Sequence, residues 1–213
     1  MNIPVLCADA RFMVLDKPAG LPAHAGRAGG PSVEDYFPKW RRGKSGPWLA
    51  HRLDQDTAGC LVIALRKAAL LQAQAAFAGG FAEKTYWAVV RNIPADHAGL
   101  IEIPIAKKTT GRNWRMVADA AAPPAITEWR KLAANAGVAL LEFTPRTGRT
   151  HQIRAHAAAI GHPVIGDAIY GGGNAPLHLL ARRIMLPLTP VLAAEAPIPA
   201  HMVANIARSG FAL

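Results

Sequence analysis

Short apolar runs of the length of a β-strand outnumber the segments with helical periodicity along this chain. The runs lie at 5–8, 12–15, 60–65, 84–90, 100–105, 126–132, 138–143 and 179–186. Apolar residues recur at helical spacing at 67–77 and 151–160, and a short helix is expected at 32–37. Because helices and strands do not alternate regularly, the sequence predicts an α+β fold, with a large mixed, mainly antiparallel sheet flanked by helices and loops.

Some of these segments allow finer predictions. The continuous apolar run at 60–65 is typical of a strand that is buried on both faces. Alternation at 84–90 places Tyr86 on the same face as the alanine and valine that follow at every second position. The short helix at 32–37 is expected to end at Pro38, since proline cannot continue a helix that needs its backbone N–H.

The chain has 213 residues, of which 51% are hydrophobic, and we expect it to form a single domain over residues 1–213. The two cysteines, Cys7 and Cys60, lack the CxxC spacing of a zinc or redox site and do not form a disulfide framework. The N-terminus lacks the basic start and apolar middle of a signal peptide, and no apolar run approaches the ~20 residues of a membrane span. These features predict a cytoplasmic protein with no membrane contact.

The charge of the chain indicates an anionic partner. Lysine and arginine outnumber aspartate and glutamate by 24 to 14, a formal net charge of +10. Three stretches at 39–44, 107–115 and 146–154 are basic and free of acids, and Trp40 and Trp114 lie inside them. Cationic and stacking side chains together suit RNA. The alternative is that these stretches are only solvated faces of the protein.

A polar loop at 51–59 places Asp54 and Asp56 beside His51 and Arg52, just before the predicted buried strand. A carboxylate beside a cation stays ionised, and in a partly dry pocket it can act as a nucleophile or a general base. An equally good interpretation of the loop alone is a turn in which the Asp54 side chain accepts hydrogen bonds from local amides.

The basic stretch at 146–154 opens the second predicted helix near Thr150. Arg146, Arg149 and the unpaired N–H groups of the first helical turn should converge there and bind an anion. Arg154 follows one turn later, where a guanidinium could hold a carboxylate through two hydrogen bonds. Alternatively, Arg154 is a surface residue of an amphipathic helix.

Other catalytic motifs are excluded by their spacing. A phosphate-binding GxxxxGK[ST] loop ending at 43–45 would need glycine at the position of Pro38. The histidines at 151–162 lack the HExxH spacing of a metal site, and no serine lies in a GxSxG turn. Any covalent chemistry is therefore expected to use a carboxylate.

Taken together, the segments HRLDQDTAGCLVIAL, KTYWAVV and RTGRTHQIRAHAAAIGHPVIGDAIYG resemble the three motifs of the RluA family of pseudouridine synthases. The N-terminal segment VLCADARFMVLDKPAGLPAHAG is similar to the entry strand and Lys-Pro-Ala-Gly loop of that family, so the resemblance covers about residues 5–187. It implies the pseudouridine synthase fold and an enzyme that isomerises uridines in ribosomal or transfer RNA without a cofactor or a metal.

The resemblance also implies roles for residues. Asp54 matches the catalytic aspartate, Tyr86 the tyrosine that stacks on the target uracil and is a candidate for the final proton transfer, and Arg154 the arginine that pairs with the catalytic carboxylate. The residues expected to contact RNA are Arg52, Arg146, Arg149, His151, Lys107, Lys108 and Arg112. The Gly- and Pro-rich loop at 17–31 and the segment at 107–115 are expected to select the substrate.

Ala58 and Cys60 depart from the family pattern, where serine and leucine are usual, and this affects only local packing. No S4-type RNA-binding domain is expected, and a monomer without an obligate protein partner is the expected state. A non-catalytic RNA-binding protein on the same fold is the main alternative. A hydrolase that uses Asp54 and Asp56 as an acid and base pair is the weaker one, because two residues of one loop cannot readily flank a sugar.

Overall fold

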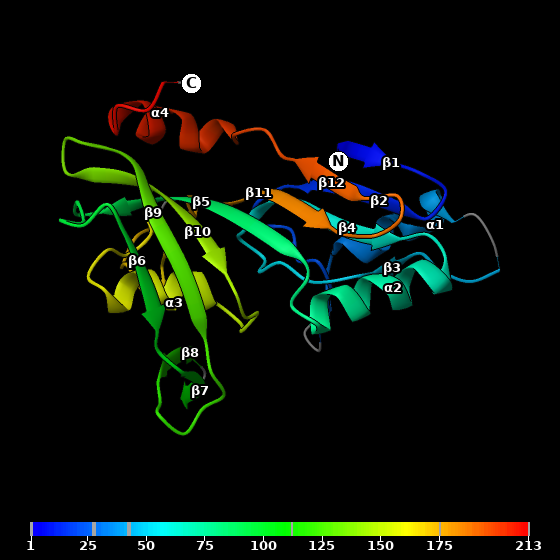
Figure 1. Ribbon diagram of the computed structural model, residues 1–213, viewed down its shortest axis with the longest axis horizontal. Helices are drawn as coiled ribbons and strands as arrows, with labels where there is room; N and C mark the ends of the chain where they lie inside the picture. Colours follow the sequence, from blue (N-terminus) through cyan, green and yellow to red (C-terminus); the bar gives the residue numbers. More distant parts are fainter. Residues whose placement is uncertain (1, 27–28, 42–43, 112, 175, 213) are drawn as a thin grey trace. The chain divides into compact units, whose positions relative to one another are not determined.

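The computed structural model describes residues 2–26, 29–41, 44–111, 113–174 and 176–212 (Figure 1). The chain divides into two compact units: unit 1 comprises Met1–Lys84 and Leu180–Pro197, and unit 2 comprises Thr85–Leu179 and Ile198–Leu213. The interpretation of residues 1–213 as a single catalytic domain stays a prediction.

Most strands of unit 1 lie in its first segment, Met1–Lys84. Its elements are β1 (Val5–Ala8), β2 (Phe12–Lys17), the 3₁₀-helix η2 (Val33–Tyr36), α1 (Phe37–Trp40), β3 (Trp48–Leu49), β4 (Ala58–Ala64), α2 (Lys67–Ala78), β11 (Leu179–Leu186) and β12 (Leu192–Glu195). Unit 2 contains β5 (Glu83–Arg91), β6 (Ala98–Glu102), β7 (Ile105–Thr110), β8 (Asn113–Ala118), β9 (Ile126–Asn135), β10 (Val138–Pro145), α3 (Gln152–Ala159) and α4 (Ala200–Arg208).

Strand β4 is the centre of unit 1. It pairs antiparallel with β2 from Gly59 to Ala64, antiparallel with β3 near its end, and parallel with β11 at Ala58 and Gly59. Every residue of β4 is buried, and α2 packs against it. The predicted buried strand at 60–65 is therefore confirmed, although it begins at Ala58.

The strands of unit 2 form the antiparallel order β5-β10-β9-β6 (Figure 1). A hydrophobic core around Phe143 and Leu141 includes Ala88 and Val90 of β5, with Tyr86 packed against it. The predicted alternation in β5 is thus confirmed. Helix α3 packs against β9 and β10, and α4 packs against β10.

The α+β class and the mixed, mainly antiparallel pairing predicted from the sequence are confirmed. The β4–β11 pair is parallel, and the other pairs described above are antiparallel. The prediction of one strand at 100–105 is wrong, because β6 ends at Glu102 and β7 begins at Ile105. Pro104, which has no N–H to donate to a strand partner, lies in the break between them.

The short helix is also longer than expected. Pro38 does not end it: η2 is followed directly by α1, and Pro38 lies in the first turn of α1, where no helical hydrogen bond needs its N–H. The start of η2 is fixed by Asp35, whose side chain accepts a hydrogen bond from the Ser32 N–H at 2.9 Å.

The strands β7 and β8 and the helix α4, like the short strands β3 and β12, were not predicted. The strands β7 and β8 pair with each other in a two-stranded sheet of their own, from Ile105↔Ala118 to Thr110↔Asn113. Figure 1 shows this hairpin, called here the β7–β8 hairpin, beyond the ends of β6 and β9. Helix α4 buries Met202 and Ile206 on one face, which is the i, i+4 spacing of an amphipathic helix.

Candidate active site

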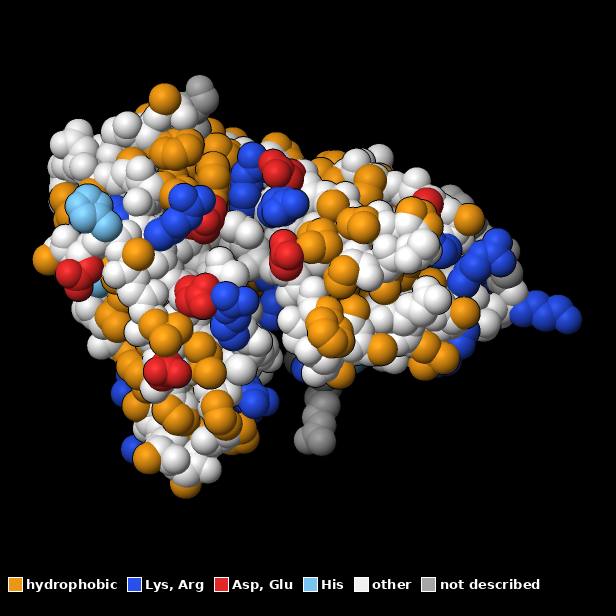
Figure 2. Space-filling model, in the orientation of Figure 1, with side chains coloured by type: hydrophobic (Ala, Val, Ile, Leu, Met, Phe, Trp, Pro, Cys, Tyr) orange, Lys and Arg blue, Asp and Glu red, His pale blue; other side chains and the backbone are white. Residues whose placement is uncertain are grey.

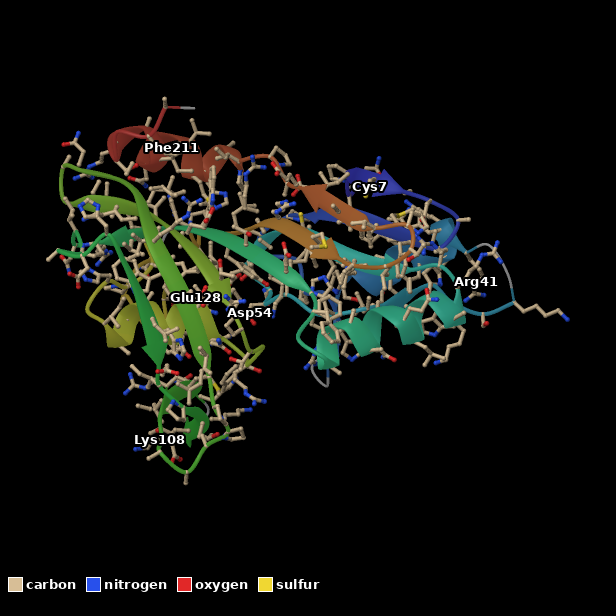
Figure 3. All side chains as sticks on the ribbon, in the orientation of Figure 1. Cys7, Arg41, Asp54, Lys108, Glu128 and Phe211 are labelled. Carbon is tan, nitrogen blue, oxygen red and sulfur yellow. The ribbon has the colours of Figure 1, made fainter. Side chains whose placement is uncertain are left out.

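The loop that carries Asp54 connects β3 to β4 in unit 1. Asp54 is half-buried, and its carbonyl oxygen accepts a hydrogen bond from the Thr57 N–H at 3.2 Å, which closes the turn before β4. Gly59 follows with φ +104°, and a Cβ at this position would overlap the carbonyl oxygen of Ala181 in β11. The loop therefore ends at a point where two strands approach closely and only glycine fits. Figure 3 labels Asp54.

Lys17, at the end of β2, holds the middle of this loop. Its side chain is fully buried, and its Nζ donates hydrogen bonds to the carbonyl oxygens of Pro18, Leu21 and Gln55 at 2.9, 2.8 and 2.8 Å. The Gln55 carbonyl also accepts a bond from the Gly20 N–H at 3.0 Å. Since Gln55 lies next to Asp54, these bonds fix the backbone that carries the carboxylate.

The pKa of Lys17 reflects this position. Burial lowers the pKa to about 8, and the charges of Asp56 and Asp54 oppose that shift. The sequence predicts no role for Lys17, because no local pattern shows that its side chain meets the carbonyl of Gln55.

His51 anchors the beginning of the loop. Its Nε2 accepts a hydrogen bond from the Val62 N–H at 3.0 Å, and its ring lies 4.9 Å from the ring of Phe77 in α2. Burial, aided by the charge of Lys84, lowers the pKa of His51 to about 4, so the ring is neutral at neutral pH. Arg52, the next residue, is exposed.

Tyr86 and Arg154 belong to unit 2. Tyr86 lies on β5 opposite Phe143 of β10 and is half-buried. Arg154 lies on α3 with only 4% of its surface exposed, so its interpretation as a surface residue is wrong. The predicted pair between Arg154 and Asp54 joins residues of different units and stays a prediction.

Arg154 forms a buried ion pair that the sequence analysis missed. Its Nε and Nη2 donate to the two carboxylate oxygens of Asp167 at 2.7 and 2.8 Å. Asp167 also accepts hydrogen bonds from the N–H groups of Ile169 and Tyr170 at 2.9 and 3.1 Å. Burial raises the pKa of Asp167, but the hydrogen bonds and charge of Arg154 and these two N–H groups outweigh it and lower the pKa.

The segment before α3 differs in part from its prediction. The helix begins at Gln152, not at Thr150, and its N-cap is His151, which has φ 52°. Arg146 donates to both carboxylate oxygens of Glu128 at 2.9 and 3.0 Å, and Arg149 donates to the Pro124 carbonyl at 3.2 Å. Both arginines therefore have partners within the protein, and their contact with RNA stays a prediction.

His151 is 9% exposed and lies between two aromatic rings. The ring of Trp114 in β8 stacks on it at 4.7 Å, and the ring of Tyr170 meets it edge-on at 5.8 Å. Nothing in the spacing of the sequence indicates that the basic stretches at 107–115 and 146–154 meet at this position.

The β7–β8 hairpin carries exposed basic side chains. Lys107, Lys108 and Arg115 are exposed, and Lys107 lies over the ring of Trp114 at 4.6 Å. Figure 3 labels Lys108 on the hairpin; in Figure 2 the visible face of this part is mostly orange and white, with Lys and Arg side chains only at its edges. The predicted RNA contact Arg112 lies outside the described residues.

Among the described residues, no group of three histidine, cysteine, aspartate or glutamate side chains could hold a metal ion. Both Cys7 and Cys60 are free thiols. No helix in the described part of the chain is both long enough and apolar enough to cross a membrane.

Comparisons with known proteins agree on one family. A family model described as RNA pseudouridylate synthase matches residues 11–159. An uncharacterized RNA pseudouridine synthase of Zymomonas mobilis is 40% identical over 208 residues, which cover 92% of this chain and 93% of that protein. The ribosomal large subunit pseudouridine synthase C of Buchnera aphidicola is 33% identical over 168 residues, 78% of this chain and 54% of that protein.

Solved structures give the same result. The human RNA pseudouridylate synthase domain containing 4 is similar with a TM-score of 0.83 and 27% identity, covering 98% of this chain and 94% of that one. The human RNA pseudouridylate synthase domain containing 1 is similar with a TM-score of 0.77, also at 27% identity, over 92% of this chain and 83% of that one.

Proposed function

This chain belongs to the RNA pseudouridylate synthase family, whose members are isomerases, and from that premise we propose that Asp54 is the carboxylate with which it converts uridine in RNA to pseudouridine. The N1–C1′ bond breaks, the uracil rotates in its pocket, and a C5–C1′ bond forms. C5 loses its hydrogen as a proton and N1 gains one, so atoms and electrons balance without a cofactor. The target uridine must first leave its stack, which costs a few kcal/mol.

The observation that most supports Asp54 is the way its loop is held. Lys17, His51 and Gly59 fix the loop in its middle, at its beginning and at its end. A catalytic group must be held to within a fraction of an ångström to be effective, and the bonds of its neighbours do this. Asp54 can then act as a nucleophile or as a base toward the sugar or the uracil.

Tyr86 and Arg154 complete the proposed site. The Tyr86 ring would stack on the flipped uracil, and its hydroxyl would take part in the final proton transfer. By the family resemblance, Arg154 would be the arginine that pairs with the catalytic carboxylate. Its guanidinium has five N–H donors, and the bonds to Asp167 through Nε and Nη2 fix the plane in which the remaining donors point.

Ribosomal RNA is the substrate we would test first. Two relatives of this chain, from Buchnera aphidicola and Zymomonas mobilis, are named ribosomal large subunit pseudouridine synthases. The exposed lysines of the β7–β8 hairpin, together with Arg52, would attract the phosphate backbone. Transfer RNA is the other substrate class. We further propose that the protein works as a monomer in the cytoplasm, where its free thiols Cys7 and Cys60 would stay reduced.

Release of tritium from C5-labelled uridine tests the proposal, because C5 must lose its hydrogen when the base is rejoined there. Unmodified ribosomal and transfer RNA are incubated separately with the wild type, with Asp54→Asn, and with Asp56→Asn as a control for an exposed carboxylate in the same loop. We expect release with the wild type and with Asp56→Asn, and none with Asp54→Asn.

The outcomes separate the candidate functions. Release that persists in Asp54→Asn would overturn the assignment of the carboxylate. Binding of RNA without release from either class, even by the wild type, would favour a non-catalytic RNA-binding protein on this fold.

A further inference from the structure

The β7–β8 hairpin depends on side-chain contacts for its position. In the described part of the chain its strands pair only with each other. Two-stranded hairpins are marginally stable in water, so packing against other elements must hold this one. Two such contacts come from His151, the N-cap of α3, and from Tyr170, in the segment that follows the helix. The backbone N–H of Met116 in β8 donates to the Tyr170 hydroxyl at 2.9 Å, and Trp114 stacks on His151 at 4.7 Å.

Tyr170 also contacts the buried ion pair of Arg154. The guanidinium carbon of Arg154 lies 5.5 Å from the centre of the Tyr170 ring, a cation–π distance. The Tyr170 N–H donates to the Asp167 carboxylate, which binds the same guanidinium. One residue therefore touches the hairpin with its hydroxyl and the Arg154 pair with its ring and backbone.

His151 gives a second connection along the same path. Its Nδ1 lies 3.2 Å from the Tyr170 hydroxyl, and Trp114 covers its ring. The Nζ of Lys107 lies over that tryptophan at 4.6 Å, so contacts run from an exposed lysine of the hairpin to Tyr170 without a gap. His151 holds this place with a left-handed backbone, which a non-glycine residue adopts only where its surroundings favour it.

We propose that Tyr170 is a positioning residue that couples the β7–β8 hairpin to Arg154, so that RNA bound on the hairpin fixes the guanidinium for the reaction. The inference rests on the proposed function, in which Arg154 belongs to the active site. An anionic RNA strand on Lys107 and Lys108 would restrain the hairpin, and the hydroxyl contacts would pass that restraint to the Tyr170 ring. Coupling of this kind is a free energy shared by two sites, so it is lost when either end of the path is cut.

A double-mutant cycle tests the coupling. Tyr170→Phe removes the hydroxyl but keeps the ring over Arg154 and the N–H to Asp167. Trp114→Ala removes the stack on His151 from the hairpin side. The rate of tritium release in a single turnover at saturating RNA is measured for both variants and for the double variant. Tyr36→Phe, the same chemical change in unit 1, is the control, with an expected rate within about twofold of the wild type.

If the path exists, each single variant lowers the saturated rate by about tenfold, and the double variant is no slower than the worse single variant. RNA affinity, measured separately, should change by less than about threefold in Tyr170→Phe, because the hydroxyl does not itself bind the strand. Additive losses in the cycle, or a loss of affinity with an unchanged saturated rate, would overturn the inference.

Two separate controls test whether the variants fold and whether the proposed function holds. Thermal unfolding shows whether Tyr170→Phe is folded at the assay temperature. If it is not, His151→Asn cuts the same path at a position where asparagine tolerates the left-handed backbone, and the same non-additivity with Trp114→Ala is expected. Persistent activity of Asp54→Asn would instead signal failure of the proposed function, whatever the cycle shows.

Discussion

The Nζ of Lys17 lies 2.8 Å from the carbonyl oxygen of Gln55, the residue next to Asp54. A fully buried lysine thus holds the backbone of the proposed catalytic loop through a charged hydrogen bond and binds two other carbonyls, those of Pro18 and Leu21, at the same time. Both the stability of unit 1 and the placement of the carboxylate should depend on it.

Lys17→Met should therefore lower stability and rate together. Methionine fills similar space but donates to none of the three carbonyl oxygens, of which the Gln55 carbonyl keeps the Gly20 N–H as a donor. A buried polar group left unpaired costs about 1–3 kcal/mol. We expect the free energy of unfolding, measured with urea, to fall by roughly 3 kcal/mol or more, and the single-turnover rate to fall at least about tenfold. Lys67→Met, at an exposed lysine of the same unit, is the control; equal stability of the two variants would contradict the prediction.

His51 predicts a pH dependence of stability. Its pKa is about 4 in the folded protein and 6.5 in the unfolded chain, so the unfolded state binds more protons between these values. The free energy of unfolding should therefore fall as the pH drops from about 6.5 to 4, by up to about 3 kcal/mol from this residue. Urea titrations across this range should give a shallower slope for His51→Gln, whose amide oxygen can still accept the Val62 N–H. His97→Gln, at an exposed position, is the control, and equal slopes for the wild type and His51→Gln would refute the prediction.

The Arg154–Asp167 pair should stabilise the folded protein less at acid pH than at neutral pH. Asp167→Asn removes the buried carboxylate that binds the Arg154 guanidinium through two hydrogen bonds, which should cost about 3–5 kcal/mol at neutral pH. The pKa of Asp167 is lowered by folding, so the stability from this carboxylate is present above its ordinary value of 3.8 and is lost as the pH falls below it. The gap in unfolding free energy between wild type and variant should therefore shrink below about pH 4. Asp119→Asn, an exposed aspartate, controls for the loss of one carboxylate; a gap that is constant with pH would argue against the charged pair.

Glu128, which Figure 3 labels, should weaken RNA binding because it forms an ion pair with Arg146. Both side chains are largely exposed, and exposed pairs contribute only about 0–1 kcal/mol to folding. Glu128→Gln should leave the fold intact, remove a negative charge beside the proposed RNA surface, and tighten RNA binding by about two- to fivefold at low salt, less at high salt. Fluorescence anisotropy over a salt series measures this. Glu195→Gln, a glutamate paired with Arg182 in unit 1, is the matched control, and weaker binding by Glu128→Gln would disprove the proposed role of Arg146.

The elements predicted correctly are those whose burial produces a hydrophobic pattern in their own sequence. The run that became β4 is apolar throughout, and Tyr86 alternates with its neighbours along β5, since one face of that strand lies on the core. The helix predicted at 67–77 is α2, which ends at Ala78 just before Gly79. In each case the pattern and the cause lie within a few residues.

The features that the sequence did not predict have no local pattern, and most of them depend on contacts between distant segments. The strand β7 exposes four consecutive residues, Lys107 to Thr110, so no alternation marks it, and only Gly111 between the basic runs hints at a turn. Asp167 lies thirteen residues from Arg154, beyond a helix end and a loop, and no period connects them. For the same reason Lys17 could be noticed in its motif but not assigned to the carbonyl of Gln55.

Tyr86→Phe isolates the proposed role of the hydroxyl in proton transfer. The ring packs against the core around Phe143, and phenylalanine keeps that packing, so the free energy of unfolding should change by less than about 1 kcal/mol. RNA affinity should stay within about threefold, because stacking needs only the ring. The single-turnover formation of pseudouridine should slow by about 10- to 100-fold if the hydroxyl moves a proton in the last step. Tyr36→Phe controls for the substitution, and a wild-type rate in Tyr86→Phe would leave Tyr86 with stacking alone and assign the proton transfer to another group.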